Sequence, residues 1–396
     1  MPIVPPVDVG MSAERLATID RVVNTGIDSG GFPGATVVVG HRGAIVWRKG
    51  YGTLDWSDQG TRADAIGTMY DLASLTKVVA TTTAIMVLYD RGRLHLDDPV
   101  SRWLPAFAGG LKGRVTIRDL LTHRSGLPEG RDLWHGARTP SGARRLVLAT
   151  PLERAPGSRE VYSDLGADVL AMVAEAAARE RLNSFLSRSV WKPLGMRHTW
   201  FRPPGSLRDH IAPTENSPPR GYPLRGEVHD ENAWALGGVA GHAGLFSSAA
   251  DLGVFAQMLL NGGEYNGVRI VRASTVALFT RRTAGWRALG WETCPGGGSC
   301  GQHMSERAFG HTGYTGTSLW IDPDRNSFVV LLTNWVHARP HHGVGPSAVL
   351  SDVRSDVADA AALAVMDEAA GALPMPTSFR ADRAIGWGRE SLISRR

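Results

Sequence analysis

Strand patterns lie at both ends of this sequence and are rare in its middle, which limits the folds that it can adopt. Two short β-branched runs within residues 35–47 are separated by Gly40-His-Arg-Gly43, a strong hairpin signal. Residues 318–332 repeat this pattern, whereas residues 80–200 hold few strand signals. We therefore predict an α/β (α+β) fold, in which an antiparallel central sheet is built from both termini, is flanked by helices and carries an inserted, mostly helical domain.

The predicted domains follow the same division of the chain. Residues 12–80 and 245–371 form the sheet domain, which ends with a helix over 347–370. Residues 81–244 form the mostly helical domain with long loops, and we expect the active site between the two domains. Residues 372–396 are polar without a clear period, so we expect them to cover the surface or to be disordered.

Composition and charge exclude several classes of function. The 396 residues are 43% apolar, enough for a large core, and the formal charge of +5 is spread along the chain without a lysine-rich block. We therefore expect no nucleic-acid partner. No run of about 18 apolar residues occurs, so we expect no membrane span. Residues 1–10 lack a signal-peptide pattern, which leaves the location open between the cytoplasm and the mature form of an exported (periplasmic or secreted) protein.

The sequence contains two cysteines, Cys294 and Cys300, on either side of Pro295-Gly-Gly-Gly-Ser299. They are too few and too simply arranged for a zinc site. Two interpretations stay open: a short-loop disulfide if the protein is exported, or two unpaired thiols on a flexible loop.

The stretch Asp71-Leu-Ala-Ser-Leu-Thr-Lys77 places a hydroxyl and an amine three residues apart at the start of an apolar helical pattern. Positions i and i+3 share a helix face, so Ser74 and Lys77 are expected to be neighbours. Ser74 would sit at the helix N-terminus, where free N–H groups can donate to an oxyanion. Burial of Lys77 would favour a free amine, a base for the hydroxyl. The same pattern also fits a serine N-cap followed by a surface lysine.

Two further motifs follow this S-x-x-K pair in order: Tyr162-Ser-Asp164 and His311-Thr-Gly313. Together they make residues 12–370 resemble the serine β-lactamase and D-alanyl-D-alanine peptidase superfamily. The resemblance is to the branch of class C β-lactamases, D-stereospecific peptidases, carboxylesterases and penicillin-binding-protein-like enzymes. Four supporting stretches are also similar to that branch, at residues 32–35, 120–128, 193–196 and 244–252.

The resemblance implies a role for each matching residue. Ser74 would be the nucleophile that forms an acyl-enzyme, with Lys77 and Tyr162 sharing the proton transfers. The N–H groups of Ser74 and Tyr314 would form the oxyanion hole. Substrate would lie along an edge strand and touch His311, Thr312 and Gly313. The resemblance implies no metal and no organic cofactor.

This sequence departs from the pattern of the superfamily at two positions. Asp164 stands where an asparagine is usual, and a carboxylate cannot donate to a substrate carbonyl. An ionised Asp164 would also keep Lys77 charged and shift the role of base toward Tyr162. A second interpretation, compatible with the first, is that Asp164 is the N-cap of the helix that follows. His311 replaces the lysine of most β-lactamases, and a neutral imidazole would lack the charge that holds a β-lactam carboxylate. Alternatively, His311 only packs at a strand end.

Other polar and aromatic residues have weaker cases. His242 lies in a glycine-dense loop and could either approach the site or bind the backbone. The polar residues His229, Asp230, Glu231 and Asn232 could line a substrate pocket or an exposed loop. The tryptophans that we consider as pocket walls are Trp134, Trp234, Trp286 and Trp335.

We therefore predict a serine hydrolase that works through an acyl-enzyme on Ser74, most simply a β-lactamase-like carboxylesterase that acts on small acyl esters. The first alternatives are a peptidoglycan-directed D-peptidase or amidase and a weak β-lactamase, because these share the mechanism. An alternative from another class is a penicillin-sensor-like binding module, which is acylated without turnover. The expected partner is a small ester, amide or peptide substrate, and the sequence does not indicate an oligomeric state.

Overall fold

A computed structural model describes residues 1–57, 59–339, 342–366 and 372–382. The central sheet has six strands in the order β2-β1-β11-β10-β9-β8, and every neighbouring pair is antiparallel. Their bounds are Gly34–His41 for β1, Ala44–Gly52 for β2, Glu292–Thr293 for β8, Phe309–Gly313 for β9, Thr317–Asp322 for β10 and Ser327–Thr333 for β11.

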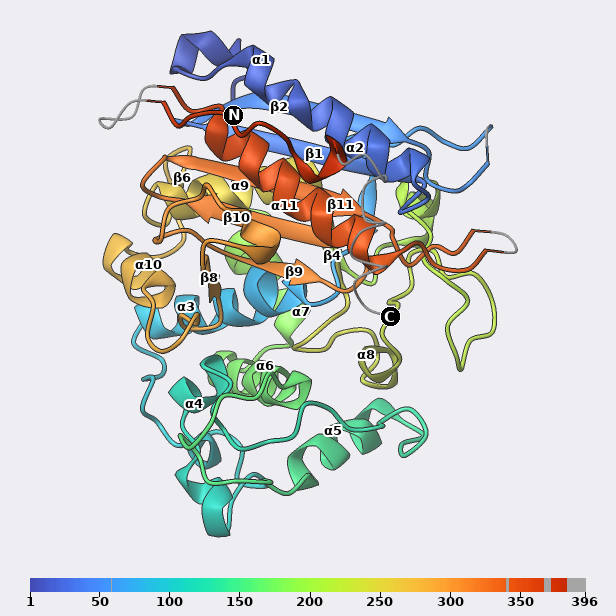
Figure 1. Ribbon diagram of the computed structural model, residues 1–396. Coiled ribbons are helices and arrows are strands. Elements are labelled where there is room, and N and C mark those ends of the chain that lie inside the picture. The colour runs from blue at the N-terminus through green and yellow to red at the C-terminus, as the bar shows by residue number, and fades with distance from the viewer. Residues whose placement is uncertain (58, 340–341, 367–371, 383–396) are drawn as a thin grey trace.

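The sheet joins the two ends of the chain, as the hairpin patterns predict. Figure 1 shows the blue strands β1 and β2 beside the orange strands β9 to β11. The β1–β11 pair places Val38 opposite Val330, and both strands are buried along their whole length. Central strands that are covered on both faces read as continuous apolar runs, which explains the valine and leucine content of these two.

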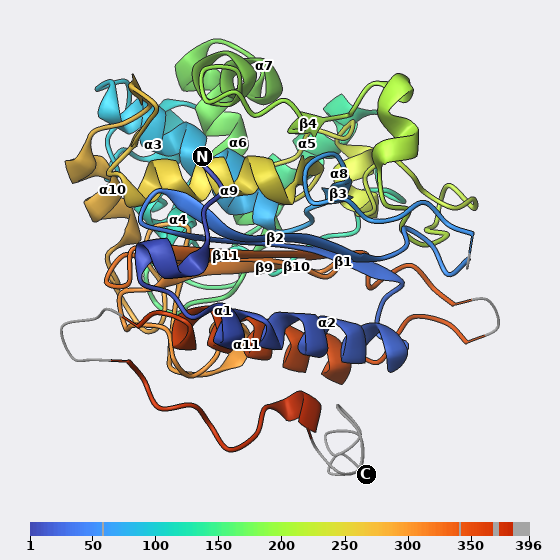
Figure 2. The same cartoon turned by 90° about the horizontal axis from the view of Figure 1, so that it is seen from above.

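Helices cover both faces of the sheet (Figure 2). One face carries α1 (Ala13–Leu16), α2 (Thr18–Asp28) and α11 (Ser347–Leu363). The other carries α9 (Ala249–Leu260), which contacts β1, β10 and β11. Helix α2 buries Ile19, Val22 and Val23, whose three- and four-residue spacing forms the apolar stripe facing the sheet.

The region between the terminal strands is mostly helical. Its helices are α3 (Thr83–Asp90), α4 (Ile117–Leu121), α5 (Pro140–Ala149), α6 (Asp164–Ala178), α7 (Leu182–Leu186) and α8 (Glu231–Ala235), with α10 (Ala273–Thr280) later in the chain. A small sheet in the order β3 (Met69–Asp71), β5 (Leu245–Ser248) and β4 (Trp200–Phe201) connects this region to the main sheet, and β6 (Glu264–Tyr265) pairs with β7 (Val268–Arg269). The predicted fold class is therefore confirmed.

Several finer expectations have different outcomes. The helix predicted over 347–370 ends at Leu363, and residues 367–370 lie outside the described part. Of the tail predicted over residues 372–396, residues 383–396 also lie outside the described part of the chain. The domain limits stay a prediction, because one hydrophobic core joins the helical region to one face of the sheet. Cys294 and Cys300 form a disulfide, which settles the choice that the sequence left open.

Two kinds of feature are absent from the described residues. Among the described helices, none has the length and apolar character that a membrane crossing requires. The described residues also contain no group of three or more His, Cys, Asp or Glu side chains placed to hold a metal ion.

Candidate active site

Ser74 lies in a sharp turn between β3 and the helical segment that carries Lys77. Ala73 adopts a left-handed conformation with φ 46°, which is unfavourable for a side chain with a Cβ. The turn is held by the Asp71 carboxylate, which accepts a hydrogen bond from the Ala73 N–H at 2.8 Å. A strained residue next to a partly exposed serine is typical of a functional site.

Lys77 is buried and points all of its donors at the site. Its side chain is 4% exposed, and Nζ lies 2.9 Å from Ser74 Oγ, 2.7 Å from Asp164 Oδ1 and 3.3 Å from the His242 carbonyl oxygen. Nζ also lies 4.7 Å from the centre of the Tyr162 ring. Burial alone would lower the pKa of Lys77, but the charge interactions and hydrogen bonds with Tyr162 and Asp164 outweigh it and raise that pKa. Lys77 is therefore an ammonium, and the free amine that burial alone suggested does not form.

Asp164 is the first residue of α6 and pairs with Lys77. Ser163 caps the helix, because its hydroxyl accepts from the Gly166 N–H at 3.1 Å. The alternative in which Asp164 is the N-cap is therefore wrong; serine and aspartate are both good caps, and the sequence alone does not choose between them. Burial would raise the pKa of Asp164, but the charges of Lys77 and His242 lower it. Its carboxylate is ionised and acts only as an acceptor.

Tyr162 is held by a histidine that the sequence did not single out. His123 has φ 56° and lies within the stretch 120–128 that supported the family resemblance. Its carbonyl accepts from the Val161 N–H at 2.8 Å, its Nδ1 accepts from the Ser163 N–H at 3.1 Å, and its ring centre lies 4.7 Å from that of Tyr162. Burial, followed by nearby positive charge, holds the pKa of His123 well below its usual range. A neutral His123 thus fixes the backbone on both sides of Tyr162.

Arg287 is a second residue that the sequence did not single out. Its guanidinium carbon lies 5.5 Å from the centre of the Tyr162 ring. Nε donates to Glu160 at 2.8 Å and Nη1 to Glu292 at 3.1 Å. Arg287 therefore adds a fixed positive charge beside Tyr162, partly balanced by two carboxylates. A single arginine in an irregular segment has no periodic signal that could have revealed it.

His311 lies on β9 facing Tyr162, with the two ring centres 5.9 Å apart. Its Nδ1 is 2.7 Å from the Thr312 carbonyl oxygen, so we assign the proton to Nδ1 and a free lone pair to Nε2. Burial lowers the pKa of His311 more than the nearby Glu292 carboxylate raises it. The imidazole is neutral, as expected for a site without the permanent cation of most β-lactamases.

Tyr314 lies in the turn between β9 and β10, and two threonines join this turn to the segment before the nucleophile. The Thr315 hydroxyl donates to the Asp71 carbonyl at 2.6 Å, and the Thr317 hydroxyl donates to the Leu72 carbonyl at 3.0 Å. These bonds fix the distance between the turn and the nucleophile. Backbone N–H groups held in fixed positions, such as those of the nucleophile and of this turn, can stabilise a developing oxyanion.

Arg354 supports the same turn from α11. Its Nη2 donates to the carbonyls of Gly313 and Thr317, at 2.6 and 3.0 Å. Burial lowers the pKa of Arg354 to about 10, which leaves the side chain charged at neutral pH.

Within the described part of the chain, the N–H groups of Ser74 and Tyr314 have no hydrogen-bond partner. Both are therefore available as the pair of oxyanion donors that the resemblance implies.

We expect Gly313→Ala to disrupt this arrangement. A Cβ at Gly313 would lie 2.2 Å from both the Leu72 carbonyl oxygen and Thr317 Oγ1, so the β9–β10 turn must move away from the nucleophile. Displacements of about 1 Å can cost about 100-fold in rate, and we expect a loss of that size in kcat/KM together with a lower Tm. Gly113→Ala is the control, because a Cβ there meets nothing within 4 Å. Equal kcat/KM in the two variants would contradict this role of Gly313.

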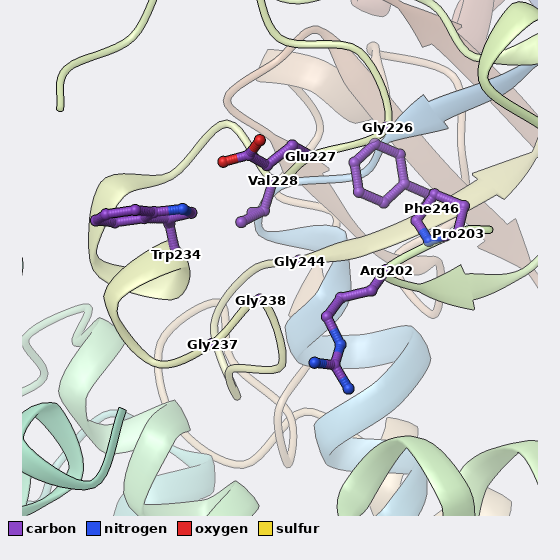
Figure 3. Close-up of a pocket in the computed structure, with 10 residues that line it drawn as sticks. All are labelled: Arg202, Pro203, Gly226, Glu227, Val228, Trp234, Gly237, Gly238, Gly244 and Phe246. Carbon is purple, nitrogen blue, oxygen red and sulfur yellow. The ribbon is translucent and has the colours of Figure 1, made fainter. Parts of the chain in front are cut away.

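Two cavities adjoin the site. The one in Figure 3 has a volume of about 400 Å³, with Trp234 and Arg202 on opposite sides and Val228 between. It lies beside β5, where Phe246 pairs with Asp71. The other has a volume of about 380 Å³ and is lined by Trp286, Arg287, Glu160, Glu292 and the disulfide loop.

The remaining residues that the sequence singled out have mixed outcomes. His229 stacks on Tyr314 with ring centres 5.8 Å apart, and Trp335 meets Tyr314 edge-on at 5.7 Å. Trp234 and Trp286 line the two cavities, whereas Trp134 stacks on the exposed His135. His229 of the polar cluster 229–232 therefore contributes to the surroundings of Tyr314.

Known proteins are similar to this chain over most of its length. The family model described as Beta-lactamase matches residues 19–352. A curated protein of Escherichia coli (strain K12), named "Putative D-alanyl-D-alanine carboxypeptidase", is 35% identical over 376 residues, which cover 84% of this chain and 85% of that protein.

Two solved structures share the fold at lower sequence identity. The first, "EstCE1, a hydrolase with promiscuous acyltransferase activity", has a TM-score of 0.71 and 24% identity, over 88% of this chain and 99% of that one. A class C beta lactamase has a TM-score of 0.69 and 17% identity, over 88% and 98%. With a family model that matches most of its length and a relative of this identity, the chain belongs to the beta-lactamase family of serine hydrolases.

Proposed function

We propose that the protein hydrolyses acyl substrates through an acyl-enzyme on Ser74, and that small acyl esters are its preferred substrates. The observation that carries the proposal is the buried Lys77 ammonium, whose Nζ lies 2.9 Å from Ser74 Oγ and 2.7 Å from Asp164. A nucleophile in direct contact with a proton partner, which is itself oriented by a third group, is the general arrangement of covalent catalysis by serine.

Each of these groups has its own role in the proposed reaction. Ser74 Oγ attacks the carbonyl carbon of the ester, its proton passes to the deprotonated hydroxyl of Tyr162, and Tyr162 then gives that proton to the departing alkoxide. Lys77 stays charged and donates to Ser74 Oγ, which favours the alkoxide form. The N–H groups of Ser74 and Tyr314 bind the oxyanion, and each such donor is worth about 3 kcal/mol in the transition state. Water then attacks the acyl-enzyme and gives a proton to Tyr162, and Tyr162 passes this proton to Ser74 Oγ as the bond to the acyl carbon breaks and the acid leaves.

The preference for esters follows from Asp164. Its carboxylate is ionised, bonded to Lys77 and unable to donate. A substrate with an amide in its acyl group would place a carbonyl oxygen near this acceptor and lose a hydrogen bond. A small acyl ester has no such amide and loses nothing.

A second candidate is a peptide that ends in D-alanyl-D-alanine. It is supported by the name of the Escherichia coli relative and by Arg287 beside Tyr162. Glu160 and Glu292 bind Nε and Nη1 of this arginine, and Nη2 has no partner among the described residues. A guanidinium with free donors suits a terminal carboxylate.

Parallel assays separate these candidates. We expect steady turnover of p-nitrophenyl acetate and butyrate, with lower kcat/KM for diacetyl-lysyl-D-alanyl-D-alanine and for nitrocefin. A higher kcat/KM for the peptide would replace the ester proposal by the second candidate. A single stoichiometric burst without steady state on every substrate would instead indicate an acylated binding module.

We expect Asp164→Asn to shift the preference from esters toward amides. The new amide supplies the missing donor, and one hydrogen bond of about 1.4 kcal/mol corresponds to about a tenfold change in the amide-to-ester ratio of kcat/KM. The ratio is measured with nitrocefin and p-nitrophenyl butyrate. Asp132→Asn is the control, because Asp132 is an exposed aspartate that pairs with a histidine outside the site. An unchanged ratio would show that Asp164 does not set the preference.

A further inference from the structure

His242 forms a buried ionic bridge next to Lys77. It lies in the loop between α8 and β5, and its side chain is 3% exposed. Nδ1 lies 2.8 Å from Oδ1 of Asp168 on α6, and Nε2 lies 2.9 Å from Oδ1 of Asp230, the N-cap of α8. The ring thus joins two helices through two carboxylates.

The backbone of the same loop docks on the segment that carries Lys77. The His242 carbonyl accepts from Lys77 Nζ at 3.3 Å. The preceding carbonyl, of Gly241, accepts from the Thr81 hydroxyl at 2.6 Å, and the Gly241 N–H donates to Asp168 at 2.8 Å. One short peptide therefore contacts the segment from Lys77 to Thr81 through its carbonyls and α6 through its N–H and imidazole.

The charges of this region alternate. Two buried cations, Lys77 and His242, are interleaved with the carboxylates of Asp164, Asp168 and Asp230. Burial opposes the charge of His242, but the carboxylates outweigh it and hold the pKa of the imidazole well above its usual range. Each carboxylate therefore has a cation, and loss of one cation would leave a buried anion to compete for the other.

We propose that His242 is a positioning residue for Lys77: the bridge to Asp168 and Asp230 fixes the His242 carbonyl on Nζ and reserves the Lys77 ammonium for Ser74 and Asp164. This inference rests on the proposed function of Ser74. His242 acts through Lys77 and does not touch the reacting atoms. Its imidazolium also makes the loss of a proton from the Lys77–Tyr162 pair easier, because a nearby positive charge opposes a second one.

The pH dependence involves every charged or titratable group that faces these two cations. Around Lys77 and His242 these groups are Asp164 and Asp168 on α6, Tyr162 before it, Asp230 at the start of α8, His123 after α4, His311 on β9 and Arg287. The rising limb of kcat/KM against pH reports loss of a proton from the Lys77–Tyr162 pair in the free enzyme. The sign of a charge removed nearby should therefore set the direction in which that limb moves.

Two single variants of the full chain test this sign. In His242→Asn a positive charge is lost, and we expect the rising limb to move to higher pH by about one unit. In Asp230→Asn a negative charge is lost, and we expect a shift in the opposite direction. In both, kcat for p-nitrophenyl butyrate should fall about tenfold or more with KM nearly unchanged, since Lys77 loses orientation while the substrate contacts remain.

The double variant His242→Asn/Asp230→Asn distinguishes an effect of charge from an effect of damaged folding, because it removes one charge of each sign. We expect its rising limb near that of the wild type, with kcat still reduced. His135→Asn is the matched control: His135 also pairs with an aspartate, at 2.6 Å, but on the surface. Its kinetics should equal those of the wild type.

The outcomes separate this inference from the proposed function. If wild-type Ser74 is not labelled by a fluorophosphonate and no ester is turned over, the proposed function fails. Suppose instead that the wild type is active and that the folded variants have a lower Tm, but the same kcat and the same pH position of the rising limb as the wild type. His242 is then only structural, and the inference fails. Opposite shifts of the limb in the two single variants, with the double variant between them, would support it.

Discussion

Ser74→Ala is expected to abolish turnover of every substrate, with kcat reduced by about 10,000-fold or more. The reason is that all steps of the proposed reaction pass through a bond between Ser74 Oγ and the acyl carbon, and the donors of the oxyanion hole cannot replace that bond. The measurement is the steady-state rate with p-nitrophenyl butyrate, together with the mass of the intact protein after brief reaction. The wild type should gain the mass of one acyl group, and the variant none.

Ser158→Ala is the control for this variant. Ser158 is exposed, and its hydroxyl donates to the carbonyl of Ala155 in a surface turn. We expect wild-type activity and the same acyl adduct. Activity in Ser74→Ala equal to that of the control would overturn the proposed mechanism, whatever the substrate.

The parts of the site that could be predicted are those set by local geometry. Ser74 and Lys77 are three residues apart, so any helical turn brings them together, and the structure places their polar atoms 2.9 Å apart. The sheet could also be predicted, because the two hairpin patterns at opposite ends of the chain can bury their apolar faces when β1 pairs with β11. In both cases a short stretch of sequence contains the whole signal.

The charge of Lys77 could not be read from its own surroundings in the sequence. It depends on Asp164, which comes 87 positions later, and on a competition between burial and charge. The sequence allowed both a free amine and a charged one, and only the proximity of Asp164 in the structure decides between them. The same holds for His242, which was expected either at the site or bonded to backbone. Its ring instead binds two carboxylates, while its carbonyl reaches Lys77.

The roles of residues that act singly could not be read from the sequence. His123 and Arg287 belong to no periodic pattern, and their importance arises only because α4 and the segment before β8 come together around Tyr162. Such contacts depend on tertiary packing, which sequence spacing does not encode. The family motif around His123 marked the correct stretch without giving the role of the residue.

Lys77→Met is expected to have the second largest effect, and the effect should divide into two parts. Loss of the ammonium removes the donor to Ser74 Oγ and the partner of Tyr162, and we expect kcat to fall about 1,000-fold. Loss of the cation also leaves the Asp164 carboxylate without its partner. Because the Asp164 side chain is 39% exposed, water can screen part of this charge, and we expect the free energy of unfolding to fall by about 1–3 kcal/mol.

The double variant Lys77→Met/Asp164→Asn separates the two parts. A neutral amide beside methionine leaves no unpaired anion, so most of the lost free energy of unfolding should return, while kcat should stay as low as in Lys77→Met. Lys49→Met is the matched control, because Lys49 forms a surface ion pair with Asp20 at the same distance of 2.7 Å and should change stability by less than about 1 kcal/mol. Urea unfolding and p-nitrophenyl butyrate hydrolysis measure the two quantities. Recovery of activity in the double variant would show that Lys77 serves only to neutralise Asp164, and the proton transfers would then belong to Tyr162 alone.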